Sequence, residues 1–117
     1  DDGGDSWTFS TEGLHGSYLR AVAVAGDTVL VSASTGPSTN RAAIYRRALK
    51  GDGPFQRCQQ GVPEWFPSNI DTFCVSASGS EVAFGTSEGS LFLSSDEGRS
   101  WTGVAEGLPP VRCVALP

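Results

Sequence analysis

The stretch Ser94-Ser95-Asp96-Glu97-Gly98-Arg99-Ser100-Trp101 decides the fold, because much of it occurs again at the start of the chain. There, Asp2-Gly3-Gly4-Asp5-Ser6-Trp7 carries the same Asp-x-Gly-x-Ser-Trp pattern. The two tryptophans lie 94 residues apart (101 − 7), and Phe55 lies about midway between them. Each of the three aromatic residues is followed six residues later by a glycine and then by an aliphatic residue. A pattern that recurs three times at a spacing of roughly 47 residues predicts a repeat protein.

Each repeat carries the signals of four short strands. A first strand, apolar on both faces, is expected at residues 19–24, 70–75 and 111–116. A second is expected at 28–32 and 81–86, a third at 42–47 and 90–94, and a fourth begins at each aromatic residue. Four-stranded repeats predict an all-β chain built of antiparallel β-propeller blades. A β-sandwich offers similar strand spacing but gives no reason for the recurring aromatic and glycine.

These strands divide the chain into one part-blade, two complete blades and a further strand. Residues 1–18 are expected to supply the outer strand of a preceding blade and a connection, residues 19–63 and 64–109 the two complete blades, and residues 110–117 the inner strand of a following blade. About two and a half blades are too few for a ring, which takes roughly 4 to 8. We therefore expect the remaining blades to come from the same parent chain or from other protomers, because an open array exposes strand edges.

The motif resembles the Asp box of BNR-repeat propellers, the sialidase-like superfamily. Its pattern Ser-x-Asp-x-Gly-x-Ser/Thr-Trp is matched by Ser94, Asp96, Gly98, Ser100 and Trp101, and from its third position onward by Asp2, Gly4, Ser6 and Trp7. The resemblance extends to xyloglucanase-type glycosidases, sortilin-type receptors and photosystem II assembly factors.

The chemistry of this motif suits a folded turn. Glycine allows positive φ, the carboxylate accepts bonds from turn amides, and the aromatic ring anchors the hairpin. We expect Asp2 and Asp96 to be structural, rather than catalytic or calcium-binding. The middle repeat has Lys50, Asp52 and Pro54 at the matching positions, so its turn has lost the carboxylate.

The resemblance implies that ligands bind at the mouth of the central channel. Arg20, Asp71 and Arg112 occupy the same position in three successive first strands. Two arginines beside a carboxylate suit an anionic group such as a sialic acid or a peptide carboxylate. Alternatively, the three side chains only neutralise one another.

An aromatic insertion, Glu64-Trp65-Phe66-Pro67, lengthens the connection before the second of these strands. We expect it to be exposed. Trp65 and Phe66 then either stack on a sugar ring or on a partner's apolar side chain, or fold back over the channel mouth. His15, the single histidine, lies in a loop and is expected at the surface.

The function expected is non-enzymatic binding of a ligand or protein, with a carbohydrate or an acidic peptide as partner. The alternative is a fragment of a sialidase-like or xyloglucanase-like glycoside hydrolase whose other catalytic residues lie on further blades. The resemblance to sialidases implies an arginine triad and a tyrosine nucleophile. Two arginines match at most, and Tyr18 and Tyr45 fit no such site, so no catalytic residue is assigned.

Composition excludes several other classes. A net charge of -5 argues against nucleic acid as a partner, and no apolar run is long enough to span a membrane. No cofactor or metal site is indicated, because Cys58, Cys74 and Cys113 lack Cys-x-x-Cys spacing. We expect Cys74 and Cys113 to be buried thiols, with a disulfide as the alternative. The compartment stays open, although the resemblance favours an extracellular or periplasmic one.

Overall fold

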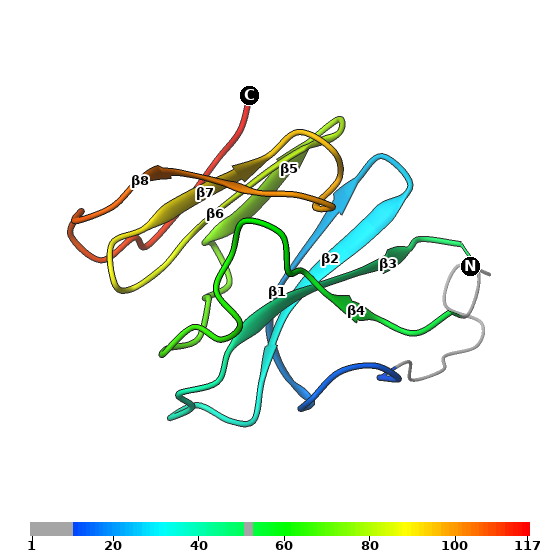
Figure 1. Ribbon diagram of the computed structural model, residues 1–117, viewed down its shortest axis with the longest axis horizontal. Coiled ribbons are helices and arrows are strands. Elements are labelled where there is room, and N and C mark those ends of the chain that lie inside the picture. The colour runs from blue at the N-terminus through cyan, green and yellow to red at the C-terminus, as the bar shows by residue number, and fades with distance from the viewer. Residues whose placement is uncertain (1–10, 51–52) are drawn as a thin grey trace.

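The computed structural model describes residues 11–50 and 53–117, which form two four-stranded antiparallel sheets and no helix (Figure 1). The first sheet contains β1 (Tyr18–Ala25), β2 (Thr28–Ser34), β3 (Ala43–Ala48) and β4 (Gln56–Arg57). The second contains β5 (Val75–Ser78), β6 (Glu81–Gly85), β7 (Leu91–Ser94) and β8 (Thr102–Ala105). Every strand pairs with the next one along the chain within its sheet. The predicted all-β class is confirmed.

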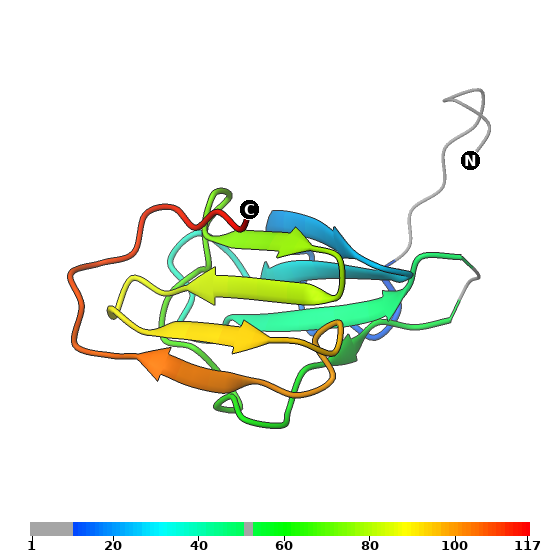
Figure 2. The ribbon, with the colours of Figure 1, turned by 90° about the horizontal axis from the view of Figure 1, so that it is seen from above.

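The two sheets pack face to face, with their strands in the same spatial order (Figure 2). Leu30 and Ile44 from the first sheet and Val82 and Phe84 from the second are buried in one shared cluster. Trp101 closes this cluster, with its ring edge-on to Phe84 at a centroid distance of 4.9 Å. Each such side chain contributes about 1.5–3 kcal/mol when it is buried, so this cluster holds the two sheets together.

The first sheet carries a second apolar cluster on its opposite face, formed by Val31, Ala33, Ala43, Tyr45 and Phe55. Strand β2 is therefore the strand buried on both faces, with six of its seven residues buried and the seventh half-buried. The sequence pattern predicts instead that the first strand of each repeat is the one buried on both faces. In β1, however, Val22 is 67% exposed and Val24 is 49% exposed.

Two of the expected strands differ in the structure. The strand expected at 70–75 begins only at Val75, because residues before it turn, with the Cys74 amide donating to the Asp71 carbonyl at 2.9 Å. The inner strand expected within 110–117 is not formed. This stretch instead follows the β5 edge through hydrogen bonds from Val114 N to Phe73 O (2.8 Å) and from Leu116 N to Ser76 Oγ (3.0 Å).

A repeated contact explains two of the three glycines that follow the aromatic residues, Gly13 and Gly61. The amide of Phe55 donates to the Glu12 carbonyl (2.8 Å), and the amide of Trp101 donates to the Gln60 carbonyl (2.9 Å). The next residues, Gly13 and Gly61, have φ of +94° and +86°, and an added Cβ would overlap the carbonyl oxygen of Phe55 or Trp101. Glycine is thus required by the aromatic residue of the following repeat.

The loop between β7 and β8 is held by the side chain of Asp96. Its carboxylate accepts hydrogen bonds from Ser94 Oγ (2.7 Å), Ser100 N (2.9 Å) and Ser100 Oγ (2.6 Å). The Gly98 amide donates to Ser94 Oγ (2.9 Å), and Trp101 Nε1 donates to the Gly98 carbonyl (3.0 Å). The matching residues at the start of the chain, Asp2, Gly4, Ser6 and Trp7, lie outside the described residues.

Candidate functional site: a polar hollow where the two sheets meet

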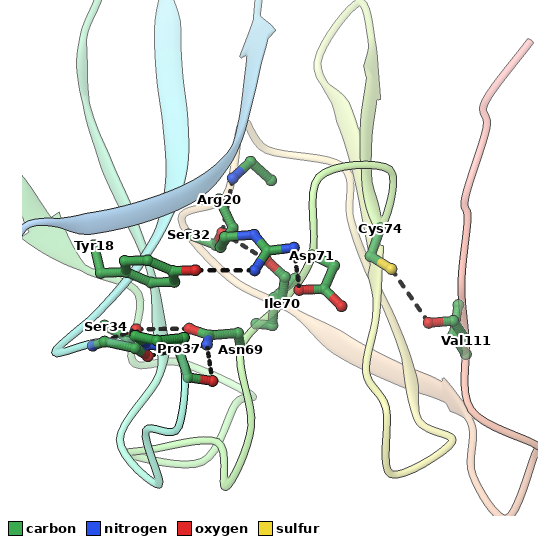
Figure 3. A network of polar contacts seen from close by, with 12 residues as sticks. Tyr18, Arg20, Ser32, Ser34, Pro37, Asn69, Ile70, Asp71, Cys74 and Val111 are labelled. Atoms are coloured by element: carbon green, nitrogen blue, oxygen red, sulfur yellow. Dashed lines mark hydrogen bonds and ion pairs between the residues drawn. The ribbon is translucent and has the colours of Figure 1, made fainter.

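Arg20 and Asp71, two of the three aligned residues, meet where β1 approaches the segment before β5 (Figure 3). Arg20 Nη2 lies 3.3 Å from Asp71 Oδ1, and Arg20 Nη1 donates to the Tyr18 hydroxyl at 3.1 Å. The hydrogen bond with Tyr18 and the charge of Asp71 together raise the pKa of Arg20. Both side chains of the ion pair are more than one-third exposed, so water screens it and it adds little to stability.

A β-bulge in β1 turns Arg20 toward this partner. The pairing of β1 with β2 shifts register between Leu19 and Ala21, which leaves Arg20 without a partner residue on β2. The displaced Ala21 amide donates to Ser32 Oγ at 3.0 Å. Bulges re-aim single side chains and recur beside functional sites.

Ser32 fixes both halves of the site. Its buried hydroxyl accepts from the amide of Ala21, the residue after Arg20, and donates to the carbonyl of Ile70, the residue before Asp71, at 2.7 Å. One hydroxyl thereby sets the spacing between the two charged side chains (Figure 3).

Asn69 closes another side of the site, and sequence reasoning missed it. Its Oδ1 accepts from Ser34 Oγ (2.6 Å), while its Nδ2 donates to the carbonyls of Gly36 (3.1 Å) and Pro37 (3.2 Å). These bonds tie the loop after β2 to the segment that carries Asp71. The only signal for Asn69 in the sequence is its place directly before Ile70 and Asp71.

Arg20, Asp71 and Asn69 line a hollow of about 360 Å³. Other residues that line it include Thr39, Ser68 and Ser87. Its surface is dominated by hydroxyl and amide groups and by the Arg20–Asp71 pair. Arg20 offers hydrogen-bond donors and Asp71 offers acceptors. Such a lining suits a neutral ligand with many hydroxyl groups better than a strongly charged one, because the ion pair already balances the charge.

Arg112, the third aligned residue, does not join this pair. It is exposed in the C-terminal stretch, and among the described residues it makes no hydrogen bond or ion pair. The structure thus brings together two of the three side chains that the alignment placed side by side.

The two aromatic residues of the insertion differ in burial: Phe66 lies in the core, and Trp65 is half-buried. Phe66 is only 4% exposed, and its backbone pairs with Ala42 through two hydrogen bonds of 2.8 and 2.9 Å. Its ring packs edge-on against Phe84 at 5.5 Å. The expectation that Phe66 is exposed is therefore wrong, because backbone pairing turns its ring into the space between the sheets.

Trp65 is half-buried among side chains of the first sheet and does not line the hollow. The guanidinium groups of Arg41 and Arg57 lie 5.0 and 5.3 Å from the centroid of its ring. The ring of His15 lies 4.5 Å away, centroid to centroid. Trp65 is thus a packed contact between loops of the first sheet.

His15 is half-buried, in contrast to the surface position expected. Its Nε2 lies 2.7 Å from the Arg41 carbonyl, so this nitrogen carries the proton and donates. In the neutral imidazole, Nδ1 then accepts from the Tyr45 hydroxyl at 2.5 Å. Burial raises the pKa of Tyr45, which keeps this hydroxyl protonated as the donor. The loop before β1 is thereby fixed to β3.

The cysteines are three unpaired thiols. Cys74 is buried as expected, but Cys113 is exposed. Within residues 11–50 and 53–117, no group of three or more His, Cys, Asp or Glu side chains could hold a metal ion. The same residues contain no helix long and apolar enough to cross a membrane.

No protein-family model matches the chain, and no curated protein matches it at a significant level.

Proposed function

We propose that the chain is a non-enzymatic binding module of a β-propeller of the Asp-box kind. We propose further that it binds a hydroxyl-rich ligand, a carbohydrate, in the hollow beside Arg20 and Asp71.

Two observations support the propeller. The two sheets have the same strand order and stack face to face. The same amide and glycine contact joins Glu12 and Gly13 to Phe55, and Gln60 and Gly61 to Trp101. Contacts that recur from one repeat to the next are what a stacked array of blades requires.

The observation that carries the binding proposal is the bulged Arg20 paired with Asp71 at the wall of the hollow. Neighbouring hydroxyl groups of a sugar both donate and accept, so they can bond to a guanidinium and a carboxylate at once. A hydrogen bond to a charged group contributes about 1.5–3 kcal/mol. An acidic peptide fits less well, since Asp71 already neutralises Arg20.

The lining also supports binding without catalysis. Glycosidases of the usual kind need two carboxyl groups roughly 5–10 Å apart across the scissile bond. Among the described residues that line the hollow, Asp71 is the single carboxylate.

The test is an NMR titration of the ¹⁵N-labelled chain with defined neutral oligosaccharides. Binding is measured from the chemical-shift changes of the Asn69 and Ser87 amides. Arg20→Ala and Asp71→Asn should each weaken binding by about tenfold. Arg112→Ala, which removes the arginine that does not reach the pair, should leave binding unchanged. Equal affinity in all four proteins would refute this site.

A second assay addresses the glycosidase alternative. We expect no turnover of chromogenic glycosides by the chain. Turnover that Asp71→Asn abolishes would replace the binding function with a hydrolytic one.

A further inference from the structure

A second hollow, lined mainly by apolar side chains, adjoins the polar hollow at Arg20. It has a volume of about 360 Å³ and is lined by residues 19–22 of β1, by Val31 of β2 and by Thr72. Arg20 lines both hollows, and Thr72 directly follows Asp71, which lines the polar one. We call this second site the apolar hollow. The two hollows therefore meet at the Arg20–Asp71 ion pair.

The β-bulge at Arg20 brings the apolar side chains together. Residues three positions apart in a regular strand lie on opposite faces. Leu19 and Val22 instead share a face, because the bulge adds one residue between them. Their partners on β2, Ala33 and Val31, are two positions apart and belong to the same buried cluster. One irregularity thus aims a charged side chain at the polar hollow and places two large apolar side chains beside it.

The apolar hollow is open to solvent. Ala21 and Val31 are buried at its base, whereas Leu19 and Val22 are 43% and 67% exposed. Among the described residues that line it, Arg20 is the single charged one, and its charge is already paired. Apolar surface of this kind gains free energy when it is covered and leaves water. A neutral, apolar group is therefore the ligand that this hollow suits.

Arg20 links the two hollows into one site. Its guanidinium is held by Asp71 at 3.3 Å and by the Tyr18 hydroxyl at 3.1 Å, which leaves its methylene stem to pack against an apolar group. Each hollow measures about 360 Å³, near the lower end of the roughly 300–1,000 Å³ of small-molecule sites. A ligand that spans Arg20 would present hydroxyl groups to one hollow and an apolar group to the other.

We propose that the apolar hollow binds the aglycone of a glycoside, which rests on the function proposed above because the sugar must lie in the polar hollow. The ligand is then a sugar with an apolar alkyl or aryl substituent rather than a free sugar. Such a glycoside binds more tightly than the sugar alone, because each methylene group that leaves water raises the affinity about fourfold.

The experiment is an NMR titration of the ¹⁵N-labelled chain with paired glycosides. The probes are the methyl and hexyl β-glycosides of glucose, galactose and cellobiose, with hexan-1-ol as the probe that lacks a sugar. A hexyl glycoside should bind at least about tenfold more tightly than its methyl partner, as expected when two methylene groups are buried. Both should shift the amides of Asn69 and Ser87, and only the hexyl glycoside should also shift those of Val22 and Thr72. Hexan-1-ol should bind more weakly than the hexyl glycoside.

The possible outcomes separate the aglycone site from the sugar site. If a methyl glycoside shifts Asn69 and Ser87 and its hexyl partner binds no more tightly, the sugar site stands and the aglycone site is refuted. If no glycoside shifts any of the four amides, both sites are refuted. If hexan-1-ol binds as tightly as the hexyl glycoside, the two hollows act independently and the aglycone site is again refuted.

Matched variants on β1 test the wall of the apolar hollow. Leu19→Thr should lower the ratio of hexyl to methyl glycoside affinity about fivefold, because it removes apolar contact while threonine still suits a strand. Val24→Thr makes a comparable change on the same strand but outside the hollow, and should leave this ratio unchanged. An equal fall in both variants would contradict the proposal.

A second copy of the chain is the competing occupant of this face, because Val22 is open to it as well. Sedimentation velocity with saturating hexyl glycoside distinguishes the two occupants. A mass of 12.2 kDa in its presence, together with a shift of the Val22 amide, supports the ligand. Association that the glycoside does not reverse, with no shift at Val22, assigns the hollow to the second copy and overturns the proposal.

Discussion

Asp96 organises its loop through three hydrogen bonds that its carboxylate accepts and that favour its ionised form. Bonds from the Ser100 side chain and backbone, and then from Ser94, lower its pKa from 3.8 to about 2. A carboxyl group whose pKa is depressed by folding stabilises the folded state above its unfolded pKa, and this contribution is lost as the pH falls toward the folded pKa. The loss for Asp96 therefore falls between about pH 4 and pH 2.

Asp96→Asn should remove this part of the acid sensitivity. The variant should unfold at a lower temperature than the wild type at pH 7, and the difference should shrink between pH 4 and pH 2. Thermal unfolding followed by circular dichroism across this pH range measures it. Asp27→Asn is the control, because the Asp27 side chain makes no hydrogen bond among the described residues. A constant difference between Asp96→Asn and wild type from pH 7 to pH 2 would contradict this role.

Residues whose partners lie nearby in sequence were predictable, and those with distant partners were not. The partners of Asp96 lie two and four residues away, so the motif alone reveals their chemistry. Asn69 bonds to Ser34 across 35 residues, and His15 bonds to Tyr45 across 30. Such pairs follow from the packing of loops, which neither composition nor periodicity encodes.

At the scale of the element, Gly13 and Gly61, two of the three glycines that follow the aromatic residues, connect successive repeats. Gly61→Ala should destabilise the fold by about 3 kcal/mol or more, because positive φ costs roughly 1–2 kcal/mol and overlap with the backbone adds about 1–3 kcal/mol. Gly107 also has positive φ, +71°, but no atom lies within 4 Å of a Cβ added there. Gly107→Ala should therefore cost only about 1–2 kcal/mol.

Urea denaturation of the two variants tests this difference. We expect a clearly larger fall in the unfolding midpoint for Gly61→Ala than for Gly107→Ala, with similar m-values. An equal fall in the unfolding midpoint would mean that the positive φ alone accounts for the need for glycine at both positions. The contact between Gly61 and Trp101 would then contribute nothing to stability.

The strands of the repeat were largely predictable, since alternation and turn residues mark β2, β3, β6 and β7 within a few residues. The segments 70–74 and 111–116 were not, although three of the five residues in the first and five of the six in the second are apolar. Ile70 is buried and Cys74 is buried, yet the backbone between them turns. Apolar runs predict burial more reliably than they distinguish a strand from a packed turn.

At the scale of the whole molecule, the described chain is compact but leaves one sheet face partly uncovered. The radius of gyration is 13.6 Å, close to the value of about 13.4 Å expected for a folded domain of this length. Even so, Leu19, Val22 and Val24 are 43%, 67% and 49% exposed along β1. Leu19 and Val22 line an apolar hollow of about 360 Å³ together with Val31 and Thr72.

This face should cause the 117-residue chain to self-associate, because burying apolar surface gains about 25 cal/mol per Å². Sedimentation velocity over a concentration series should show a rise above the monomer mass of 12.2 kDa. The double variant Val22→Thr and Val24→Thr keeps the β-branched shape that suits a strand but makes the face polar, so it should shift the equilibrium toward monomer. Val104→Thr, at a residue that is 50% exposed on β8, makes the same change on the other sheet and should have no such effect. If the wild-type chain stays at 12.2 kDa at every concentration, the β1 face is not an interface. If Val104→Thr is as effective as the double variant, association runs through the second sheet instead.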